Sequence, residues 1–147
     1  MADVPVRRNF ANVGTQWGRG TMHILLVEDD ATCREIVGAA LRVHGHHVTS
    51  VSCGAEAVDL LEVGLKPDLL LTDIQLPGDL DGWLLARHFK EEMPELPVVY
   101  MTGRRRDNDQ VTNSIYLLKP VRPSLLMDVI GAIGPADPYR SATRVLH

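Results

Sequence analysis

Apolar residues fall in short, nearly continuous runs between residues 22 and 118. A parallel strand that is covered by helices on both faces gives such a run, because neither face meets water. The first run, Met22–Val27, stops abruptly at three acidic residues. By this pattern we expect five strands, at residues 22–27, 47–51, 68–73, 97–102 and 114–118.

The segments between these runs carry apolar residues at the spacing of three or four that is typical of helices. The first helix should begin at a capping box formed by Thr32 and Glu35 and end at Gly45. The same pattern predicts helices over residues 55–63, 82–93 and 123–133. Strands that alternate with helices indicate an α/β fold, with a doubly wound parallel sheet and helices on both of its faces.

The remaining segments lack a clear period. Residues 1–21 are expected to form a flexible arm, residues 22–133 one domain, and residues 134–147 a tail. The stretch 103–115 has only two sizeable apolar residues and is otherwise polar, so we expect a fourth helix there to be short or disordered. Asn113, within that stretch, is expected to face solvent.

Charge and composition narrow the class of partner. The 147-residue chain has a net charge of −4, and its ends, residues 1–21 and 135–147, carry +2 and +1, which leaves −7 for the middle. Such a surface disfavours nucleic acid. No apolar run approaches the roughly 18–20 residues of a membrane span, and no secretory signal is visible. Cys33 and Cys53 lack metal-ligand spacing, so we expect reduced thiols in a cytoplasmic protein.

Four of the five predicted strands end in polar groups, and in such sheets ligands bind at the carboxyl ends of the strands. These groups are Glu28-Asp29-Asp30, Asp73, Thr102 and Lys119. Carboxylates gathered at one place repel each other unless a divalent cation lies between them, and oxygen ligands suit Mg²⁺. Asp73 is then a candidate carboxylate nucleophile that forms an aspartyl phosphate. Lys119 and Thr102 could each bind a phosphoryl oxygen.

The order and spacing of four motifs resemble the receiver domains of two-component response regulators. The motifs are Val27-Glu28-Asp29-Asp30, Leu71-Thr72-Asp73-Ile74-x-Leu76-Pro77, Tyr100-Met101-Thr102-Gly103 and Tyr116-Leu117-Leu118-Lys119-Pro120. The resemblance covers about residues 22–133. It implies a flavodoxin-like sheet of order 2-1-3-4-5 and a Mg²⁺ cofactor.

The resemblance also implies a role for each matching position. Asp73 would be the phosphoacceptor, Thr102 the switch hydroxyl and Lys119 the phosphate-binding lysine. The expected metal ligands are Glu28 (directly or through water), Asp29, Asp73 and the backbone carbonyl of Gln75. Tyr116 matches the aromatic residue that changes rotamer on activation, although a fixed packing role is equally compatible with its place in a strand. The bond between Lys119 and Pro120 is expected to be cis.

Two features depart from the family pattern. The loop Leu76–Gly82 is one residue longer than the commonest family spacing, but the extra residue follows the metal-facing positions. The family normally begins within a few residues of the first strand, and Met22 stands right before that strand. Residues 1–21 therefore precede the usual start of the family. Residues 1–21 could therefore be a native arm, the product of an upstream translation start or a cloning remnant.

The predicted function is that of a signalling module and not of an enzyme. Asp73 would accept a phosphoryl group from a sensor histidine kinase or a histidine phosphotransfer protein, and a mainly monomeric domain would then act on an unknown downstream protein. Two alternatives stay open at this stage. One is a pseudo-receiver that binds its partner without phosphorylation, and the other is a cofactor-binding enzyme on the same fold.

Overall fold

The computed structural model describes residues 21–103, 113–133 and 144–146. Residues 1–20 of the predicted arm and residues 104–112 of the stretch 103–115 therefore lie outside the described residues. The expectation of a short or disordered fourth helix remains a prediction for the same reason.

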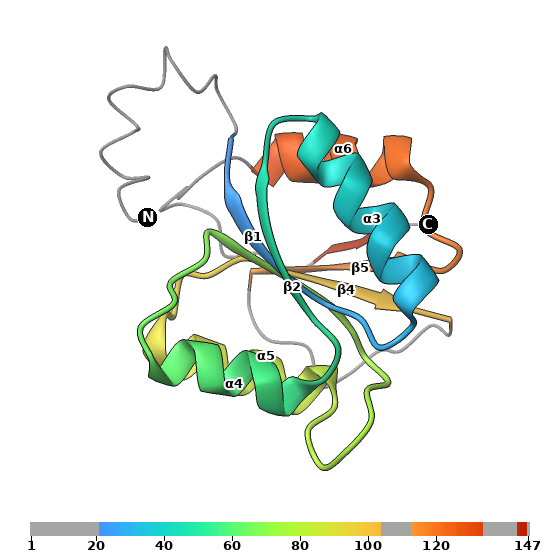
Figure 1. The fold of residues 1–147 in the computed structure, drawn as a ribbon. Coiled ribbons are helices and arrows are strands. Elements are labelled where there is room, and N and C mark those ends of the chain that lie inside the picture. Colours follow the sequence, from blue (N-terminus) through green and yellow to red (C-terminus); the bar gives the residue numbers. More distant parts are fainter. Residues whose placement is uncertain (1–20, 104–112, 134–143, 147) are drawn as a thin grey trace.

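A parallel sheet forms the centre of the molecule (Figure 1). Its strands are β1 (His23–Val27), β2 (His47–Val51), β3 (Leu69–Asp73), β4 (Val98–Thr102) and β5 (Ser114–Leu118). These five are ordered β2-β1-β3-β4-β5, which confirms the predicted order 2-1-3-4-5. A sixth strand, β6 (Arg144–Leu146), pairs in parallel with β5 at the sheet edge. The sequence did not predict β6, because three residues are too few to show a strand period.

Four helices are described, and they lie in two layers (Figure 1). They are α3 (Ala31–Val43), α4 (Gly54–Glu62), α5 (Gly82–Glu92) and α6 (Pro123–Ile133). Helices α3 and α6 cover one face of the sheet, while α4 and α5 cover the other. Alternate residues of β1 serve the two layers: Ile24 packs towards α3 and α6, and Leu25 packs towards α4 and α5. In the part of the chain that the structure describes, no helix combines the length and the apolar character needed to cross a membrane.

The start of α3 corrects the predicted capping box. Asp30 is the N-cap, and its Oδ1 accepts a hydrogen bond from the backbone N–H of Cys33 at 2.8 Å. The helix thus begins at Ala31, before the predicted cap at Thr32. Asp30 at the end of the acidic loop takes the N-cap position, and its carboxylate satisfies the free N–H of Cys33 in the first turn. Gly45, just after the helix, has a φ of 94°, as its predicted role in ending the helix requires.

Asn113 does not face solvent, which corrects a second prediction. Its side chain is 7% exposed, and its Nδ2 donates to the carbonyl of Glu95 at 3.0 Å. The Asn113 carbonyl accepts from the N–H of Val98 at 3.1 Å. Its φ of 59° lies in the left-handed region, which asparagine tolerates better than most residues. A polar residue that supports the start of two strands looks like a loop residue in the sequence.

Candidate functional site

The carboxyl ends of the strands bring together residues that are far apart in the sequence. Glu28 directly follows β1, and its N–H donates to the carbonyl of Val51 at 3.1 Å. Asp73 is the last residue of β3. Lys119 directly follows β5, and its N–H donates to the Thr102 carbonyl at 2.7 Å. Backbone hydrogen bonds at the sheet edge therefore fix the positions from which these side chains extend.

The side chain of Lys119 bridges two carboxylates. Its Nζ lies 2.8 Å from Oδ2 of Asp73 and 3.0 Å from Oε1 of Glu28. Glu28 is fully buried, and the Asp73 side chain is 10% exposed, while Lys119 is 27% exposed. The sequence predicted that the three residues share a site, but it assigned Lys119 only to a phosphoryl oxygen. The contact with Glu28 was not predicted.

Burial and charge act in opposite directions on this group. Burial raises the pKa of Glu28, and the charge of Asp73 adds to that, although the Lys119 hydrogen bond opposes the rise. Burial alone would lower the pKa of Lys119. The hydrogen bonds to Asp73 and Glu28 outweigh it and raise the pKa of Lys119 well above its ordinary value. Lys119 is therefore a permanent cation at neutral pH.

Cys33 also contacts this group, although the sequence marked it only as a structural thiol. Its side chain lies beside Glu28, and each affects the pKa of the other. Burial and the neighbouring Glu28 carboxylate raise the pKa of the Cys33 thiol to about 11. Cys33 thus keeps its proton at neutral pH. The only sequence signal was its place in the first turn of the helix that follows the acidic residues.

The acidic residues fit a divalent cation. Glu28, Asp29 and Asp73 each offer an oxygen, and these oxygens lie within 4.8 Å of one another. Among the described residues, this is the sole group of three or more potential metal ligands that lie so close together. Three carboxylates and one lysine leave two negative charges, which one Mg²⁺ ion would balance. Asp29 is exposed, so the group is open to solvent.

The loop after β3 packs tightly against Asp73. The N–H of Gln75 donates to Oδ1 of Asp73 at 3.3 Å, and the N–H of Gly82 donates to the Ile74 carbonyl at 2.7 Å. A Cβ at Gly82 would overlap the Asp73 carbonyl oxygen, so this position excludes a side chain. The loop thus keeps its close approach to Asp73 despite the extra residue. The Gln75 carbonyl remains a predicted ligand.

Thr102 and Tyr116 lie where the sequence placed them, on β4 and β5. Thr102 is buried at the end of β4, one residue beyond Met101, which pairs with Asp73 in the sheet. The peptide bond between Lys119 and Pro120 is cis, as the resemblance implied.

Tyr116 belongs to an aromatic cluster beneath the site. It is fully buried, and its ring lies 6.0 Å from that of Trp83 and 6.3 Å from that of Tyr100, measured between centroids. Trp83 is itself 5% exposed and packs within this cluster. The buried orientation of the Tyr116 ring would be one of the two rotamers in the predicted change. Whether the ring moves stays a prediction.

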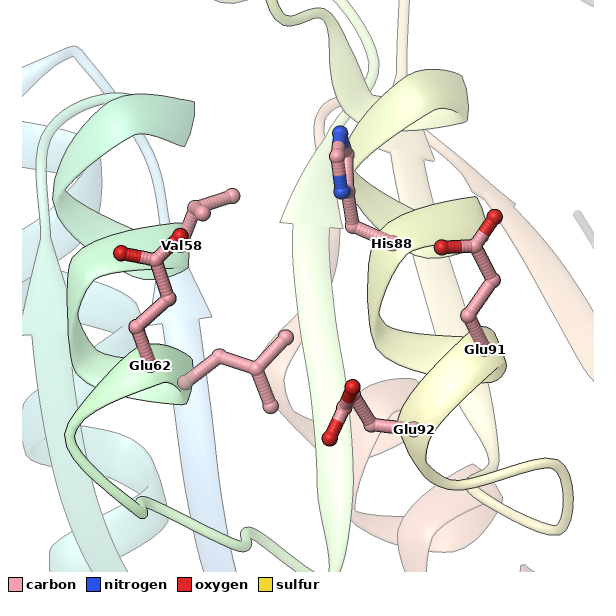
Figure 2. Close-up of a pocket in the computed structure, with 6 residues that line it drawn as sticks. Val58, Glu62, His88, Glu91 and Glu92 are labelled. Carbon is pink, nitrogen blue, oxygen red and sulfur yellow. The ribbon is translucent and has the colours of Figure 1, made fainter.

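A groove of about 330 Å³ lies elsewhere, between α4 and α5 (Figure 2). It is lined by Val58, Leu61, Glu62, His88, Glu91 and Glu92. None of the predicted site residues lines this groove. The chemistry that the sequence predicts therefore belongs to the strand ends and not to this groove.

Comparisons with known proteins identify the family of the chain. Residues 24–131 match the family model of the response regulator receiver domain. The chain is 34% identical over 113 residues to the two-component response regulator ORR6 of Oryza sativa subsp. japonica, a match that covers 70% of this chain and 65% of ORR6. It is 32% identical over 115 residues to the transcriptional regulatory protein AfsQ1 of Streptomyces coelicolor, covering 75% of this chain and 50% of AfsQ1. The chain thus spans about half to two thirds of these relatives.

Solved structures show the same fold. A response regulator receiver protein from Sinorhizobium medicae superposes with a TM-score of 0.73 at 33% identity, covering 77% of this chain and 94% of that protein. The chemotaxis response regulator CheY4 of Vibrio cholerae, at 19% identity, shares the fold with a TM-score of 0.68 over 77% of this chain and 98% of its own. The chain therefore belongs to the response regulator receiver domain family of two-component systems.

Proposed function

We propose that Asp73 is the phosphoacceptor of this domain and that a Mg²⁺ ion held by Glu28, Asp29 and Asp73 assists its phosphorylation. The observation that supports this most directly is the contact between Lys119 Nζ and Asp73 Oδ2 at 2.8 Å. It holds a permanent cation beside the carboxylate that would attack. The remaining two negative charges of the group suit a divalent ion.

The reaction would be a transfer between two protein side chains. A carboxylate oxygen of Asp73 attacks the phosphorus of a phosphohistidine on a kinase or phosphotransfer protein. The new oxygen–phosphorus bond forms as the nitrogen–phosphorus bond breaks, and the released imidazole takes a proton from solvent. Bound Mg²⁺ would supply positive charge for the phosphoryl oxygens. Lys119 would pass from the carboxylate to one phosphoryl oxygen, and the Thr102 hydroxyl would donate to another.

The output would be a change in protein binding. When Thr102 turns towards the phosphoryl group, β4 and the aromatic ring of Tyr116 beside it would favour a second conformation. The kinase, the phosphotransfer protein and the downstream target are proposed here as classes, without a specific partner. We further propose a cytoplasmic location and a mainly monomeric state.

Labelling with a small phosphodonor tests the proposal. Full-length protein is incubated with acetyl phosphate and Mg²⁺, and the intact mass is measured. Wild type should gain one phosphoryl group that is lost in base, and Asp73→Asn should gain none. Asp59→Asn, an exposed change on α4, is the matched control and should be labelled like wild type. Undiminished labelling of Asp73→Asn would exclude Asp73 as the acceptor.

The same experiment separates the pseudo-receiver alternative. A pseudo-receiver would bind its partner equally well with or without phosphodonor and would not be labelled. Beryllofluoride with Mg²⁺ gives a second measurement, because it mimics the phosphoryl group on an aspartate. Shifts of amide resonances around Thr102 and Tyr116 in wild type, absent in Asp73→Asn, are expected if the two residues respond to the site.

A further inference from the structure

Arg34 lies on α3 and points back towards the acidic loop. Its Nη1 donates to the carbonyl of Glu28 at 2.7 Å and lies 3.4 Å from the carbonyl of Asp29. Glu28 and Asp29 are two of the three carboxylates of the proposed metal site. One guanidinium group therefore contacts the backbone of both residues and not their carboxylates.

These contacts constrain the direction of the two side chains. The carbonyl and the Cα–Cβ bond of a residue are linked by one backbone conformation, so a carbonyl held in place limits where the side chain can point. A guanidinium group is planar and rigid and stays charged at any physiological pH. Half-buried Arg34 is thus well suited to fix the loop between β1 and α3.

Other contacts hold the far side of the same loop. The N–H of Asp30 donates to Oε2 of Glu28 at 3.1 Å, and Asp30 caps α3. These bonds hold the Glu28 side chain and the helix start. Neither contacts the peptide that joins Glu28 to Asp29. Within the described residues, the hydrogen bonds to these two carbonyls come from Arg34.

We propose that Arg34 is a positioning residue for the metal-binding pair, an inference that rests on the proposed function. With Arg34 in place, Glu28 and Asp29 are already arranged before the cation binds, so binding does not have to order the loop. Without Arg34, ordering the backbone of about one residue would accompany binding. That cost corresponds to roughly tenfold weaker Mg²⁺ affinity.

The same helix offers a matched control. Arg42 also donates from its guanidinium to a backbone carbonyl, that of Val48, at 3.3 Å. Val48 lies on β2, away from the acidic loop. Arg34→Gln and Arg42→Gln therefore remove the same group from the same helix, and each breaks a guanidinium–carbonyl contact. Only the first contact supports the metal-binding pair.

Calorimetric titration of full-length protein with MgCl₂ tests the inference, with melting temperature without Mg²⁺ as the check on folding. We expect about tenfold weaker Mg²⁺ binding for Arg34→Gln, a smaller loss for Arg34→Lys, and wild-type binding for Arg42→Gln. Labelling of Arg34→Gln by acetyl phosphate should approach the wild-type rate at saturating Mg²⁺, because Asp73 and Lys119 are intact. The defect should thus lie in the Mg²⁺ dependence and not in the maximal rate.

Each opposing result has a distinct meaning. Wild-type Mg²⁺ affinity in Arg34→Gln, or equal losses in Arg34→Gln and Arg42→Gln, would overturn the role of Arg34 while leaving the proposed function intact. If Arg34→Gln does not fold, Arg34→Lys carries the test, and unchanged affinity with a folded lysine variant would contradict the need for a planar group. Wild-type protein that neither binds Mg²⁺ nor accepts phosphate would instead contradict both proposals.

Discussion

Polar side chains gather at both ends of the central sheet, but they do different things at each end. At the amino ends of the strands they bind the backbone. Asp68 Oδ2 accepts from the N–H of His23 at 2.9 Å, and His46 Nδ1 accepts from the N–H of Met22 at 3.1 Å. At the carboxyl ends charged side chains meet each other, as Lys119 does with Glu28 and Asp73.

The difference separates stability from function. A side chain that satisfies a buried backbone group stabilises the fold, because an unpaired N–H would cost free energy. Carboxylates held close together destabilise the fold until a cation balances them. Substitutions at the amino ends should therefore change the stability and spare Mg²⁺ binding. Substitutions at the carboxyl ends should change Mg²⁺ binding most.

The largest effect is expected for Asp29→Ala. Removal of a proposed direct ligand should weaken Mg²⁺ binding by about 100-fold or more, since even residues that only support a ligand cost roughly 10–100-fold. Asp30→Ala is the control, because Asp30 caps α3 and is not among the clustered ligands. It should lower the free energy of unfolding by about 1 kcal/mol and bind Mg²⁺ nearly normally. Equal losses of affinity in a metal titration would show that the ligand is wrongly assigned.

The next effect links stability to the cation. Lys119→Ala leaves fully buried Glu28 beside Asp73 without a compensating charge. Without Mg²⁺, we expect the free energy of unfolding to fall by about 2–3 kcal/mol. This loss is smaller than that for breaking a fully buried ion pair, because Lys119 is partly exposed. Added Mg²⁺ should stabilise this variant more than wild type, as it binds a more negative group. Urea unfolding with and without MgCl₂ measures both quantities, and a deficit that Mg²⁺ leaves unchanged would contradict the argument.

Much of this arrangement could be predicted from the sequence. The apolar run of β1 ends at Glu28, and that of β3 ends at Asp73. In a doubly wound parallel sheet, the carboxyl ends of neighbouring strands meet at one edge. The strand order and the meeting of Glu28, Asp29 and Asp73 with Lys119 therefore follow from the pattern and the resemblance.

Contacts that depend on side-chain direction could not be predicted. The bond from Lys119 to Glu28 spans 91 positions in the sequence, and the Arg34 contacts depend on how α3 packs against the loop before it. Asn113 was misplaced because a left-handed residue that donates to a distant carbonyl has the composition of a solvent-exposed loop. Local spacing carries no information on such long-range bonds.

A smaller effect is expected at the amino ends. Asp68→Ala removes the acceptor of the His23 N–H, and Asp68 is 7% exposed. The unfolding free energy should fall by about 1–2 kcal/mol because a nearly buried N–H is left unpaired. Mg²⁺ affinity should not change, since the site lies at the other end of β1. A calorimetric titration showing weaker Mg²⁺ binding at unchanged melting temperature would reverse the assignment of the two ends.

The smallest effect is a pH dependence at His46. Burial lowers the pKa of His46, and the charges of His44 and His47 add to this. A histidine with a lowered folded pKa contributes full stability above its unfolded pKa of about 6.5, and this stability is lost as the pH falls towards the folded pKa. Protonation would place a charge in this half-buried position beside His44 and His47, and protonated Nδ1 could no longer accept from the N–H of Met22. Urea unfolding should therefore give a lower free energy of unfolding at pH 5.5 than at pH 7.5. His46→Gln should make this difference smaller, by an amount between a fraction of a kcal/mol and about 1 kcal/mol. His88 is an exposed residue of the α4–α5 groove, and His88→Gln should leave the difference unchanged. If both variants lose stability on acidification as wild type does, the acceptor role of His46 is wrong.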